Sequence, residues 1–566
     1  MTTLIAQPAR VKQAGRRHQN LALAHQRLMI LMLLFIIATC VIAGRLVMLN
    51  LTRNSHANTV DLSSFTPPRA DIVDRNGEVL ARTIDAWSIG IHPDKLLTTP
   101  EALAPQLAAL MPERTEAQYL ALLKSGDSFF YLRRRALPDL VAQVNALGEP
   151  AMDYVREPQR LYPQTTLAAH VLGFTNFDGN GVAGMERALN PRLTDATQRN
   201  TPIALSIDTR VQGALESELS AGMVKHRALG AGGLVLDAQT GEVLAMASLP
   251  VFNPNKSGES SEDSRRNAVT QGVYELGSTF KPLTFANALD TGTVTSLAKR
   301  YDATAPLTIG KYKIHDDEPA HRWLNMPEAL VHSSNIVTAQ IADMMGQQKM
   351  ASFFQKLQFN KAPVIELREK GKPIWPKFWA RTTVMTVGFG HGMSVTPLQL
   401  AQAYAALTNH GLLRPSTLIK ADPAHIAKPS RVFSESTSMT MRKMLRLVVM
   451  KGTGRKADVE GMRVGGKTGT AEKHLEGGGY KKHANVSTFV SVFPMDNPRY
   501  VVLTMLDEPH GTADTGGFTT AGQVSAPIAG KIIARIGPML GLNPDMSKDI
   551  DVSDMLPLLW SPKGER

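Results

Sequence analysis

The longest apolar segment of the chain lies near its N-terminus. Residues 28–44 contain no charged side chain, and residues 46–49 extend the segment beyond Arg45. About 20 apolar residues cross a bilayer as a helix, and an arginine near one end can extend its charge to the interface. The pattern predicts a transmembrane anchor over residues 28–49, after a basic cytoplasmic tail over residues 1–27. A cleaved signal peptide and a buried soluble helix are the two alternatives.

The pattern is irregular from residue 50 to residue 201. Thr66-Pro67-Pro68 is typical of a stiff stalk, and residues 74–78 predict a turn between two short apolar strands. Residues 100–148 have the apolar spacing of helices. No group of residues suited to catalysis stands out here. We therefore predict an elongated pedestal domain over residues 50–201, which docks partners.

A more regular pattern begins near residue 202. It predicts a strand over residues 203–207, a helix over residues 208–223 and a hairpin over residues 233–248. A helical middle part follows, and residues 486–493 and 500–506 predict a second hairpin. Strands that flank a helical middle indicate an α+β domain, an antiparallel sheet covered by helices, over residues 202–540. Residues 541–566 read as a tail, and it stays open whether Leu556, Leu558, Leu559 and Trp560 dock.

Composition and charge exclude several classes. The apolar fraction of 43% and the charged fraction of 20% are those of a folded protein. Cys40 is the only cysteine, which excludes an intramolecular disulfide and a cysteine-based metal site. Seven of the twelve net positive charges fall in residues 1–60, which contain no acidic residue. The excess therefore belongs to the membrane end, and we expect no nucleic-acid partner.

Ser278 and Lys281 form a Ser-x-x-Lys motif at a predicted helix start. Pro282 is tolerated in a first helical turn, and an apolar run follows it. Because positions i and i+3 share a helix face, the Lys281 amine is expected beside the Ser278 hydroxyl, as a serine nucleophile requires of its base. The helix N-terminus adds free N–H groups where an oxyanion forms. A second copy, Ser296 to Lys299, shows that the spacing alone is not specific, since an exposed pair gives it too.

The second motif, Ser333-Ser334-Asn335, is the only Ser-x-Asn in the chain. It precedes a helical run, where serine and asparagine are favoured as caps. The functional interpretation places the Ser333 hydroxyl and the Asn335 amide across from Lys281, where they pass its proton onward. The two interpretations are compatible.

The third motif, Lys467-Thr468-Gly469-Thr470, contains the only Lys-Thr-Gly in the chain and lies on a predicted edge strand. Lys467 with two hydroxyl groups suits a carboxylate, and the Thr470 N–H suits an oxyanion. The small Gly469 leaves room for another chain against the strand. An exposed lysine on an edge strand is the alternative.

Two other groups of residues are weaker candidates. Residues 452–456 have the glycines of a phosphate-binding loop but no strand leading into them, so we interpret them as a turn. His315, Asp316, Asp317 and His321 are potential metal ligands, yet no HExxH motif accompanies them. We therefore expect neither a metal nor a cofactor.

Taken in order, the three motifs resemble the set found in penicillin-binding proteins and serine β-lactamases. The chain is similar to class B penicillin-binding proteins over about residues 66–535, and specifically to septal, cell-division peptidoglycan D,D-transpeptidases. The segments that carry the resemblance are residues 69–81, 181–186, 249–255, 394–401 and 451–472. Leu276 departs from the family, which often has proline there, and we assign no role to His391.

The resemblance implies a substrate and a location. It implies a donor stem peptide that ends in D-Ala-D-Ala, an amine of a neighbouring stem as acceptor, and inhibition by β-lactams. It also implies a single-pass protein of the bacterial inner membrane with its catalytic domain in the periplasm at the division septum. The implied partners are a multi-spanning division glycan polymerase and other division proteins.

Chemistry gives each motif residue an expected role. An ordinary lysine has a pKa near 10.4, so a neutral base at pH 7 needs a depression of about 3 units, or about 4 kcal/mol. Burial, the helix N-terminus and the like charge of Lys467 are all expected to lower the pKa of Lys281. Lys281 then takes the proton of Ser278, Ser333 relays it to the leaving amine, and Asn335 orients Lys281 and the donor peptide.

Two other function classes remain open at this stage. One is a hydrolase, either a D,D-carboxypeptidase or a β-lactamase, that uses the same serine. The other is a membrane-tethered β-lactam sensor or a division scaffold without enzymatic activity. A tail of 27 residues is too short for a signalling domain, and a scaffold does not need three intact motifs.

Overall fold

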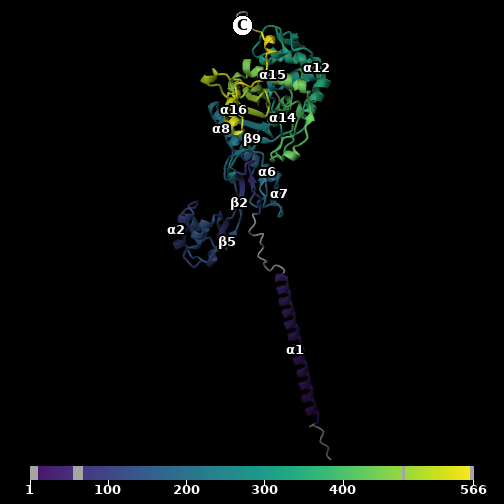
Figure 1. The fold of residues 1–566 in the computed structure, drawn as a ribbon. Helices are drawn as coiled ribbons and strands as arrows, with labels where there is room; N and C mark the ends of the chain where they lie inside the picture. Colours follow the sequence, from purple (N-terminus) through teal and green to yellow (C-terminus); the bar gives the residue numbers. More distant parts are fainter. Residues whose placement is uncertain (1–10, 55–67, 475–478, 561–566) are drawn as a thin grey trace, which may run out of the picture. The chain divides into compact units, whose positions relative to one another are not determined.

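The computed structural model describes residues 11–54, 68–474 and 479–560. It separates into two units, residues 1–66 and 67–566. The first unit contains α1 (Val11–Asn54), which Figure 1 shows as one long helix. Within α1, Gln26–Arg45 is apolar and long enough to cross a membrane. The segment predicted as an anchor is therefore helical.

The N-terminal part of the second unit contains two antiparallel-rich sheets. One has the strand order β6-β2-β1-β7 and the other has the order β4-β3-β5. Their strands are β1 (Ile72–Val73), β2 (Val79–Ile84), β3 (Trp87–Ile91), β4 (Phe130–Ala136), β5 (Met152–Arg156), β6 (Gln159–Leu161) and β7 (Ile203–Ala204). Their helices are α2 (Pro100–Leu110), α3 (Glu116–Leu123), α4 (Pro138–Asn145), α5 (Ala169–Leu172), α6 (Gly184–Ala188) and α7 (Asn190–Thr194).

Residues 87–156 form an inserted lobe with a core of its own. Apolar side chains of α2, α3, α4 and the β4-β3-β5 sheet pack together there, including Leu103, Leu107 and Tyr119. The Ala86 carbonyl accepts a hydrogen bond from the Glu157 N–H at 2.8 Å, so the chain enters and leaves the lobe at adjacent points. Three helices confirm the helical spacing of residues 100–148, but β4 lies between them and was not predicted.

The C-terminal part is built on a five-stranded antiparallel sheet with the order β16-β17-β18-β8-β9. Its strands are β8 (Gly230–Asp237), β9 (Val243–Leu249), β16 (Gly465–His474), β17 (Tyr480–Phe493) and β18 (Tyr500–Asp507). Both predicted hairpins are thus confirmed. The helices around the sheet are α8 (Thr209–Lys225), α9 (Glu262–Arg265), α10 (Lys281–Asp290), α11 (Met326–Val331), α12 (Asn335–Lys356), α13 (Arg381–Gly388), α14 (Pro397–Thr408), α15 (Glu435–Lys451) and α16 (Ser525–Met539).

Helices cover both faces of this sheet (Figure 1). Successive side chains of a strand point to opposite faces, and Leu234 and Leu236 belong to one apolar cluster while Val235 belongs to the other. The first cluster includes side chains of α10, α12, α14 and α15, and the second includes those of α8 and α16. Burial on both faces explains why these strands read as continuous apolar runs. The predicted α+β fold is confirmed.

Three short two-stranded sheets complete the C-terminal part. They pair β10 (Arg300–Tyr301) with β13 (Leu324–Asn325), β11 (Leu307–Ile309) with β12 (Tyr312–Ile314), and β14 (Leu412–Leu413) with β15 (Ser430–Arg431). The strand predicted over residues 203–207 is shorter than expected. Only Ile203–Ala204 is a strand, and it pairs in parallel with β1.

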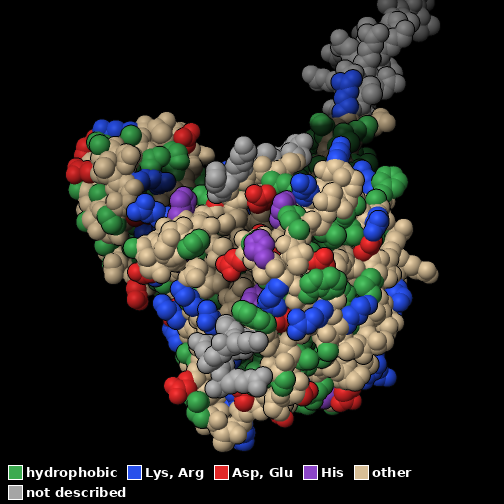
Figure 2. Space-filling view, turned by 90° about the horizontal axis from the view of Figure 1, so that it is seen from above, with side chains coloured by type: hydrophobic (Ala, Val, Ile, Leu, Met, Phe, Trp, Pro, Cys, Tyr) green, Lys and Arg blue, Asp and Glu red, His purple; other side chains and the backbone are tan. Residues whose placement is uncertain are grey.

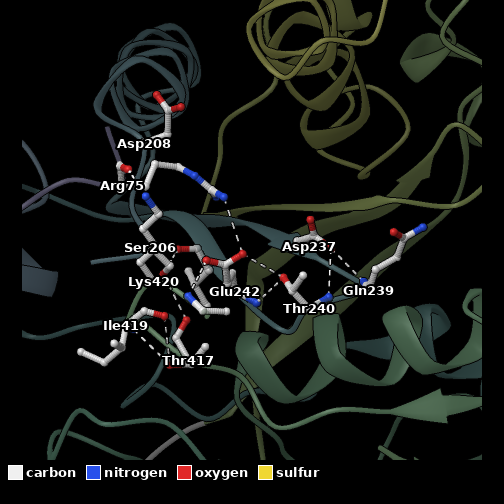
Figure 3. A network of polar contacts seen from close by, with 12 residues as sticks. Arg75, Ser206, Asp208, Asp237, Gln239, Thr240, Glu242, Thr417, Ile419 and Lys420 are labelled. Atoms are coloured by element: carbon white, nitrogen blue, oxygen red, sulfur yellow. Dashed lines mark hydrogen bonds and ion pairs between the residues drawn. The ribbon is translucent and has the colours of Figure 1, made fainter. Parts of the chain in front are cut away.

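A polar network joins the turn at Arg75 in the N-terminal part to the C-terminal part (Figure 3). The buried carboxylate of Glu242 accepts hydrogen bonds from the Thr240 hydroxyl at 3.1 Å and the Ala421 N–H at 2.9 Å, and it lies 3.6 Å from the Arg75 guanidinium. Lys420 Nζ donates to the Arg75 carbonyl at 2.9 Å. The predicted turn at residues 74–78 therefore docks on the β8–β9 turn and the segment around residue 420.

The predicted C-terminal tail, as far as residue 560, packs on the C-terminal part. The Trp560 N–H donates to Glu328 at 2.9 Å, and the Leu558 carbonyl accepts from Asn325 at 2.6 Å. Both partners cap α11, which ends just before Ser333. On the face drawn in Figure 2, lysine and arginine side chains are interspersed with acidic and uncharged ones.

Candidate active site

Ser278 lies on a tight turn at the start of a helix. A 3₁₀ turn over Gly277–Phe280 leads directly into α10, with Pro282 in its first turn as predicted. Gly277 has a φ of 53°, a left-handed conformation that favours glycine. The Tyr404 hydroxyl donates to the Thr279 carbonyl at 2.7 Å, which anchors the turn to α14.

The Lys-Thr-Gly motif lies on β16, the edge strand of the five-stranded sheet, as predicted. A Cβ atom at Gly469 would come within 2.3 Å of the Leu276 carbonyl and 2.7 Å of the Thr279 methyl carbon. The room beside Gly469 is thus filled by the turn that carries Ser278, a segment of the same chain. The glycine brings the nucleophile turn against the strand.

Lys281 and Lys467 meet at the hydroxyl of Ser333. Both lysines are fully buried. Lys281 Nζ lies 3.1 Å and Lys467 Nζ 2.9 Å from Ser333 Oγ, and Lys281 also donates to the Ser333 carbonyl. Within the part of the chain that the structure describes, no carboxylate lies within ion-pair distance of either amine, and no hydrogen bond joins Ser278 to Lys281. The three motifs therefore converge on Ser333.

The loop before α12 holds Ser333 in an unusual conformation. Its φ of 61° lies in the left-handed region, which costs a non-glycine residue about 1–3 kcal/mol and is often retained at functional sites. Ser334 is the N-cap of α12, as the cap interpretation predicts, and its hydroxyl donates to Asp316 at 2.7 Å. Asn335 donates to the His315 carbonyl at 2.9 Å rather than to Lys281.

Burial changes the protonation of both lysines. It lowers the pKa of Lys281 to about 7, against the opposing effect of the carboxylates of Asp316 and Asp317. The pKa of Lys467 is also lowered well below its usual range, first by burial and then by the charge of Lys281. The repulsion between the two amines, expected from the sequence, contributes to the lowered pKa of Lys467. A neutral Lys281 is a competent base near pH 7.

A pocket of about 860 Å³ opens beside Ser278. Asn335 and Thr470 line it together with Ser278, so residues from all three motifs reach one cavity. Thr468 lies just behind, and its hydroxyl contacts that of Thr453 at 2.7 Å. Residues 452–454, which we interpreted as a turn, thus support the Lys-Thr-Gly strand.

The sequence did not predict a second polar group, which lies behind the pocket wall. Glu275 is buried and accepts hydrogen bonds from the Gly392 N–H at 2.7 Å and the Tyr480 hydroxyl at 3.1 Å. His391 Nδ1 lies 3.5 Å from the same carboxylate. The position of Glu275 three residues before the nucleophile is the one signal that pointed to it.

The four residues considered as metal ligands do not form a metal site. Asp316 accepts hydrogen bonds from Ser334 and from the Ile336 N–H, so it caps α12. Among the described residues no group of three or more His, Cys, Asp or Glu side chains is placed to hold a metal ion.

A serine on a helix N-terminal turn, with two buried lysines around a second serine and an edge strand beside it, defines a serine acyl-transfer site. The penicillin binding protein transpeptidase domain matches residues 231–534, and the penicillin-binding protein dimerisation domain matches residues 64–193. The chain therefore belongs to the penicillin-binding protein transpeptidase family.

Named relatives agree with this placement. The chain is 41% identical over 483 residues to a probable peptidoglycan D,D-transpeptidase FtsI of Caulobacter vibrioides, covering 84% of this chain and 82% of the relative. It is 31% identical to a probable peptidoglycan D,D-transpeptidase PenA of Neisseria gonorrhoeae (91% and 93% covered). It is 28% identical to the peptidoglycan D,D-transpeptidase FtsI of Escherichia coli K12 (95% and 96% covered).

The fold has a counterpart among solved structures. A crystal structure of a peptidoglycan synthetase from Bifidobacterium adolescentis superposes with a TM-score of 0.65 at 22% identity, covering 85% of this chain and 96% of that one. The class B penicillin-binding protein resemblance is thus confirmed. Among the described residues, one helical segment, Gln26–Arg45 near the N-terminus, is long and apolar enough to cross a membrane, as in a single-pass membrane protein.

Proposed function

We propose that this chain is a peptidoglycan D,D-transpeptidase that cross-links stem peptides through an acyl-enzyme on Ser278 during septal wall synthesis. The observation that carries the proposal is the Ser333 hydroxyl, which contacts both buried lysines beside the turn that bears Ser278. The names of the relatives, peptidoglycan D,D-transpeptidases, supply the substrate class.

The proposed acylation step uses the two lysines differently. Neutral Lys281 takes the proton of Ser278, whose oxygen attacks the carbonyl of the penultimate D-alanine. Their contact tightens when substrate binds, as active-site hydrogen bonds often do. The proton passes through Ser333 to the leaving D-alanine amine, and the N–H groups of Ser278 and Thr470 hold the oxyanion. Asn335 orients the donor peptide from the pocket wall.

Residues 467–470 are proposed to bind the terminal carboxylate of the donor. The Lys467 amine and the hydroxyls of Thr468 and Thr470 supply the hydrogen-bond donors that a carboxylate needs. A β-lactam carries a carboxylate at a similar distance from its ring carbonyl. The same contacts therefore place that carbonyl at Ser278, which makes the protein a β-lactam target.

Labelling with a fluorescent penicillin tests this assignment. The full-length protein in detergent is expected to form a covalent adduct whose labelled peptide contains Ser278. Ser278→Ala abolishes the label, whereas Ser296→Ala, in the exposed second Ser-x-x-Lys copy, retains it. Label on a peptide without Ser278 would contradict the proposal.

The lifetime of the adduct separates transfer from hydrolysis. Rapid hydrolysis of the ester needs a base aimed at a water, as glutamate provides in one β-lactamase class. The sequence has no Glu-x-x-Leu-Asn pattern between Ser333 and Lys467. We expect an adduct that lasts many minutes and waits for an amine. Many turnovers of penicillin per second would favour a hydrolase instead.

The parts outside the catalytic domain are proposed to locate it. We place a cytoplasmic tail at residues 1–27, an uncleaved anchor at 28–49, a partner-docking pedestal at 50–201, the periplasmic transpeptidase domain at 202–540 and the tail at 541–566. The proposed partners are a multi-spanning glycan polymerase and other proteins of the division septum. A mature N-terminus beyond the anchor would contradict this arrangement.

The inserted lobe offers a clean test of partner docking. Its core is separate, and its ends are adjacent at Ala86 and Glu157. Replacing residues 87–156 by a short Gly-Ser linker is expected to leave penicillin acylation intact while cell division fails. Loss of acylation in a variant that still folds would show that the lobe also supports the active site.

A further inference from the structure

A histidine on the pocket wall and a buried carboxylate behind it have no role in the acylation step. We call His391, Glu275 and Tyr480 the His391 cluster. Glu275 is 3% exposed in its side chain and His391 31% exposed. Glu275 receives the Tyr480 hydroxyl at 3.1 Å and the Gly392 N–H at 2.7 Å, while His391 Nδ1 lies 3.5 Å from it. Both His391 and Tyr480 line the pocket that contains Ser278.

The cluster is held directly against the nucleophile turn. A Cβ atom at Gly390 would lie 2.1 Å from the Gly277 carbonyl, so the backbone beside His391 touches the residue before Ser278. Glu275 itself lies three residues before Ser278 in the chain. The His391 ring also packs near Phe389 and Tyr480, with centroid distances of 5.4 and 6.2 Å. Several elements therefore fix the ring at the edge of the site.

The second half of the proposed reaction lacks a proton acceptor. An acceptor amine reaches the acyl-enzyme as an ammonium ion at neutral pH, because its pKa lies near that of lysine. It must lose one proton before it can attack the ester and a second proton as the amide forms. Lys281 and Ser333 can return the second proton to the Ser278 oxygen. The first proton needs another base.

We propose that His391 takes that first proton, with Glu275 and Tyr480 as positioning residues, so that the His391 cluster forms the acceptor side of the active site. The proposal rests on the proposed transpeptidase function. With Nδ1 turned to Glu275, Nε2 on the other side of the ring is the nitrogen available to a molecule in the pocket.

The proposed step balances in atoms and charge. The ammonium group gives a proton to neutral His391, which becomes an imidazolium. The free amine attacks the ester carbonyl, the bond to Ser278 Oγ breaks, and the second amine proton reaches Oγ through Ser333 and Lys281. The products are the amide cross-link and the free serine, and the imidazolium releases its proton to solvent.

The protonation state of His391 suits this role. Burial lowers the pKa of His391, and the charge of Lys281 lowers it too, while three carboxylates raise it. The ionisable groups that face it are Glu275, Lys281, Asp317, Glu472 and Tyr480. Burial and the charge of Glu275 raise the pKa of Tyr480, so its hydroxyl stays protonated and donates to Glu275. Neutral imidazole is thus the resting form at pH 7, and it is lost only in acid.

The test separates acylation from aminolysis in the full-length protein. A D-alanyl thioester serves as donor and D-alanine as acceptor, and mass spectrometry measures the aminolysis and hydrolysis products from pH 5 to 9. His391→Asn is expected to lower aminolysis about 100-fold, the lower end of the range for a general base. Acylation by penicillin is expected to fall much less than aminolysis, because it does not use His391 as a base. The acidic inflection of the aminolysis rate disappears in this variant.

The positioning residue gives a second signature. Glu275 raises the pKa of His391, so Glu275→Gln is expected to move the acidic inflection of aminolysis to lower pH. The chain also provides a matched control, because His410 and Glu435 form an exposed pair at 2.9 Å. His410→Asn is expected to leave both half-reactions unchanged.

Two results would overturn the inference. If His391→Asn slowed penicillin acylation and aminolysis to the same extent, the histidine would only support the packing of the Gly277 turn. If aminolysis kept its rate and its acidic inflection, His391 would not be the base. Failure of the unaltered protein to react with penicillin would instead refute the proposed function, which makes the two failures distinguishable.

Discussion

Two groups of buried ionisable side chains in the described part of the chain differ in how their charges are compensated. In the N-terminal part, Glu186 is fully buried between Arg69 and Arg160, whose guanidinium nitrogens lie 2.5 and 2.7 Å from its oxygens. In the active site, Lys281 and Lys467 are just as deeply buried. Among the described residues, neither lysine has a carboxylate within ion-pair distance.

The two groups differ in whether opposite charges surround the buried ion, and this decides whether the group stabilises the fold or takes part in a reaction. An ion that leaves water is tolerated when opposite charges and hydrogen bonds surround it, and it then remains charged. Without a partner it gives up its charge instead, as the lowered pKa values of both lysines indicate. The arginine-glutamate cluster therefore stabilises the fold, whereas the lysine pair yields a base at neutral pH.

The largest effect on the rate of acylation is expected from replacing Lys281, the buried base that has no carboxylate partner in the described part of the chain. Lys281→Met should slow penicillin acylation about 10⁴-fold, or about 5 kcal/mol in activation free energy, because no other group takes the Ser278 proton. It should also raise the melting temperature, since an apolar side chain of similar length avoids the cost of a buried amine. Labelling kinetics and calorimetry measure the two effects.

The control for this change is Lys299→Met, in the exposed Ser296 to Lys299 copy, which should alter neither quantity. A Lys281→Met protein that melted at a lower temperature would contradict the contrast between the two groups of charges.

Replacing Glu186, whose charge is compensated by Arg69 and Arg160, should lower stability and leave acylation intact. Glu186→Gln leaves two buried guanidinium groups without their carboxylate, which should lower the free energy of unfolding by about 3–5 kcal/mol. The protein that remains folded should keep its rate of penicillin acylation. Denaturant unfolding and labelling kinetics give the two measurements.

Glu157 provides a more exposed control for Glu186. It also pairs with two arginines, Arg134 and Arg135, but these three side chains are between 16% and 48% exposed, so Glu157→Gln should cost less than Glu186→Gln, about 1 kcal/mol. Equal losses at Glu157 and Glu186 would show that burial does not decide the strength of these clusters.

A third change tests what holds the lysine site together in place of ion pairs. Gly469→Ala places a methyl group 2.3 Å from the Leu276 carbonyl and should displace the Ser278 turn. A shift of about 1 Å can cost about 10²-fold in rate, so acylation should fall by that order. Gly213→Ala, on α8 with open space around it, is the matched control. Unchanged acylation in Gly469→Ala would show that the turn tolerates the shift.

The Gly469 contact also marks the limit of what the sequence could predict. The order of the three motifs, the α+β fold and the edge position of β16 follow from local patterns, and the structure bears out the fold and the edge strand. The glycine was interpreted as room for another chain, because sequence does not tell which segment fills a space. The site roles of Ser278, Lys281, Ser333, Asn335 and residues 467–470 remain proposals for the labelling experiments.

Long-range partners explain the other differences. Glu275 and His391 are 116 positions apart, and nothing local indicates that their side chains lie side by side. Asn335 was expected to orient Lys281, but its amide bonds to the His315 carbonyl, which a loop brings to it. Strand β4 was missed because it lies between helices whose spacing dominates residues 100–148.

The smallest expected effect is on the pKa of Lys281, which the nearby carboxylate of Asp317 raises. Penicillin acylation should rise with pH through about 7, because only neutral Lys281 accepts the Ser278 proton. Asp317 raises that pKa, so Asp317→Asn should lower it and move the inflection to lower pH. The variant should then acylate faster than the unaltered protein at pH 6, relative to their plateaus above pH 8. Asp317→Asn also removes a negative charge that repels the anionic drug, and this can raise the rate equally at every pH. Dividing each rate by its own plateau removes that contribution. Asp302→Asn, an exposed change, should leave the inflection in place, and a shift to higher pH in Asp317→Asn would mean that Lys281 is not the titrating base.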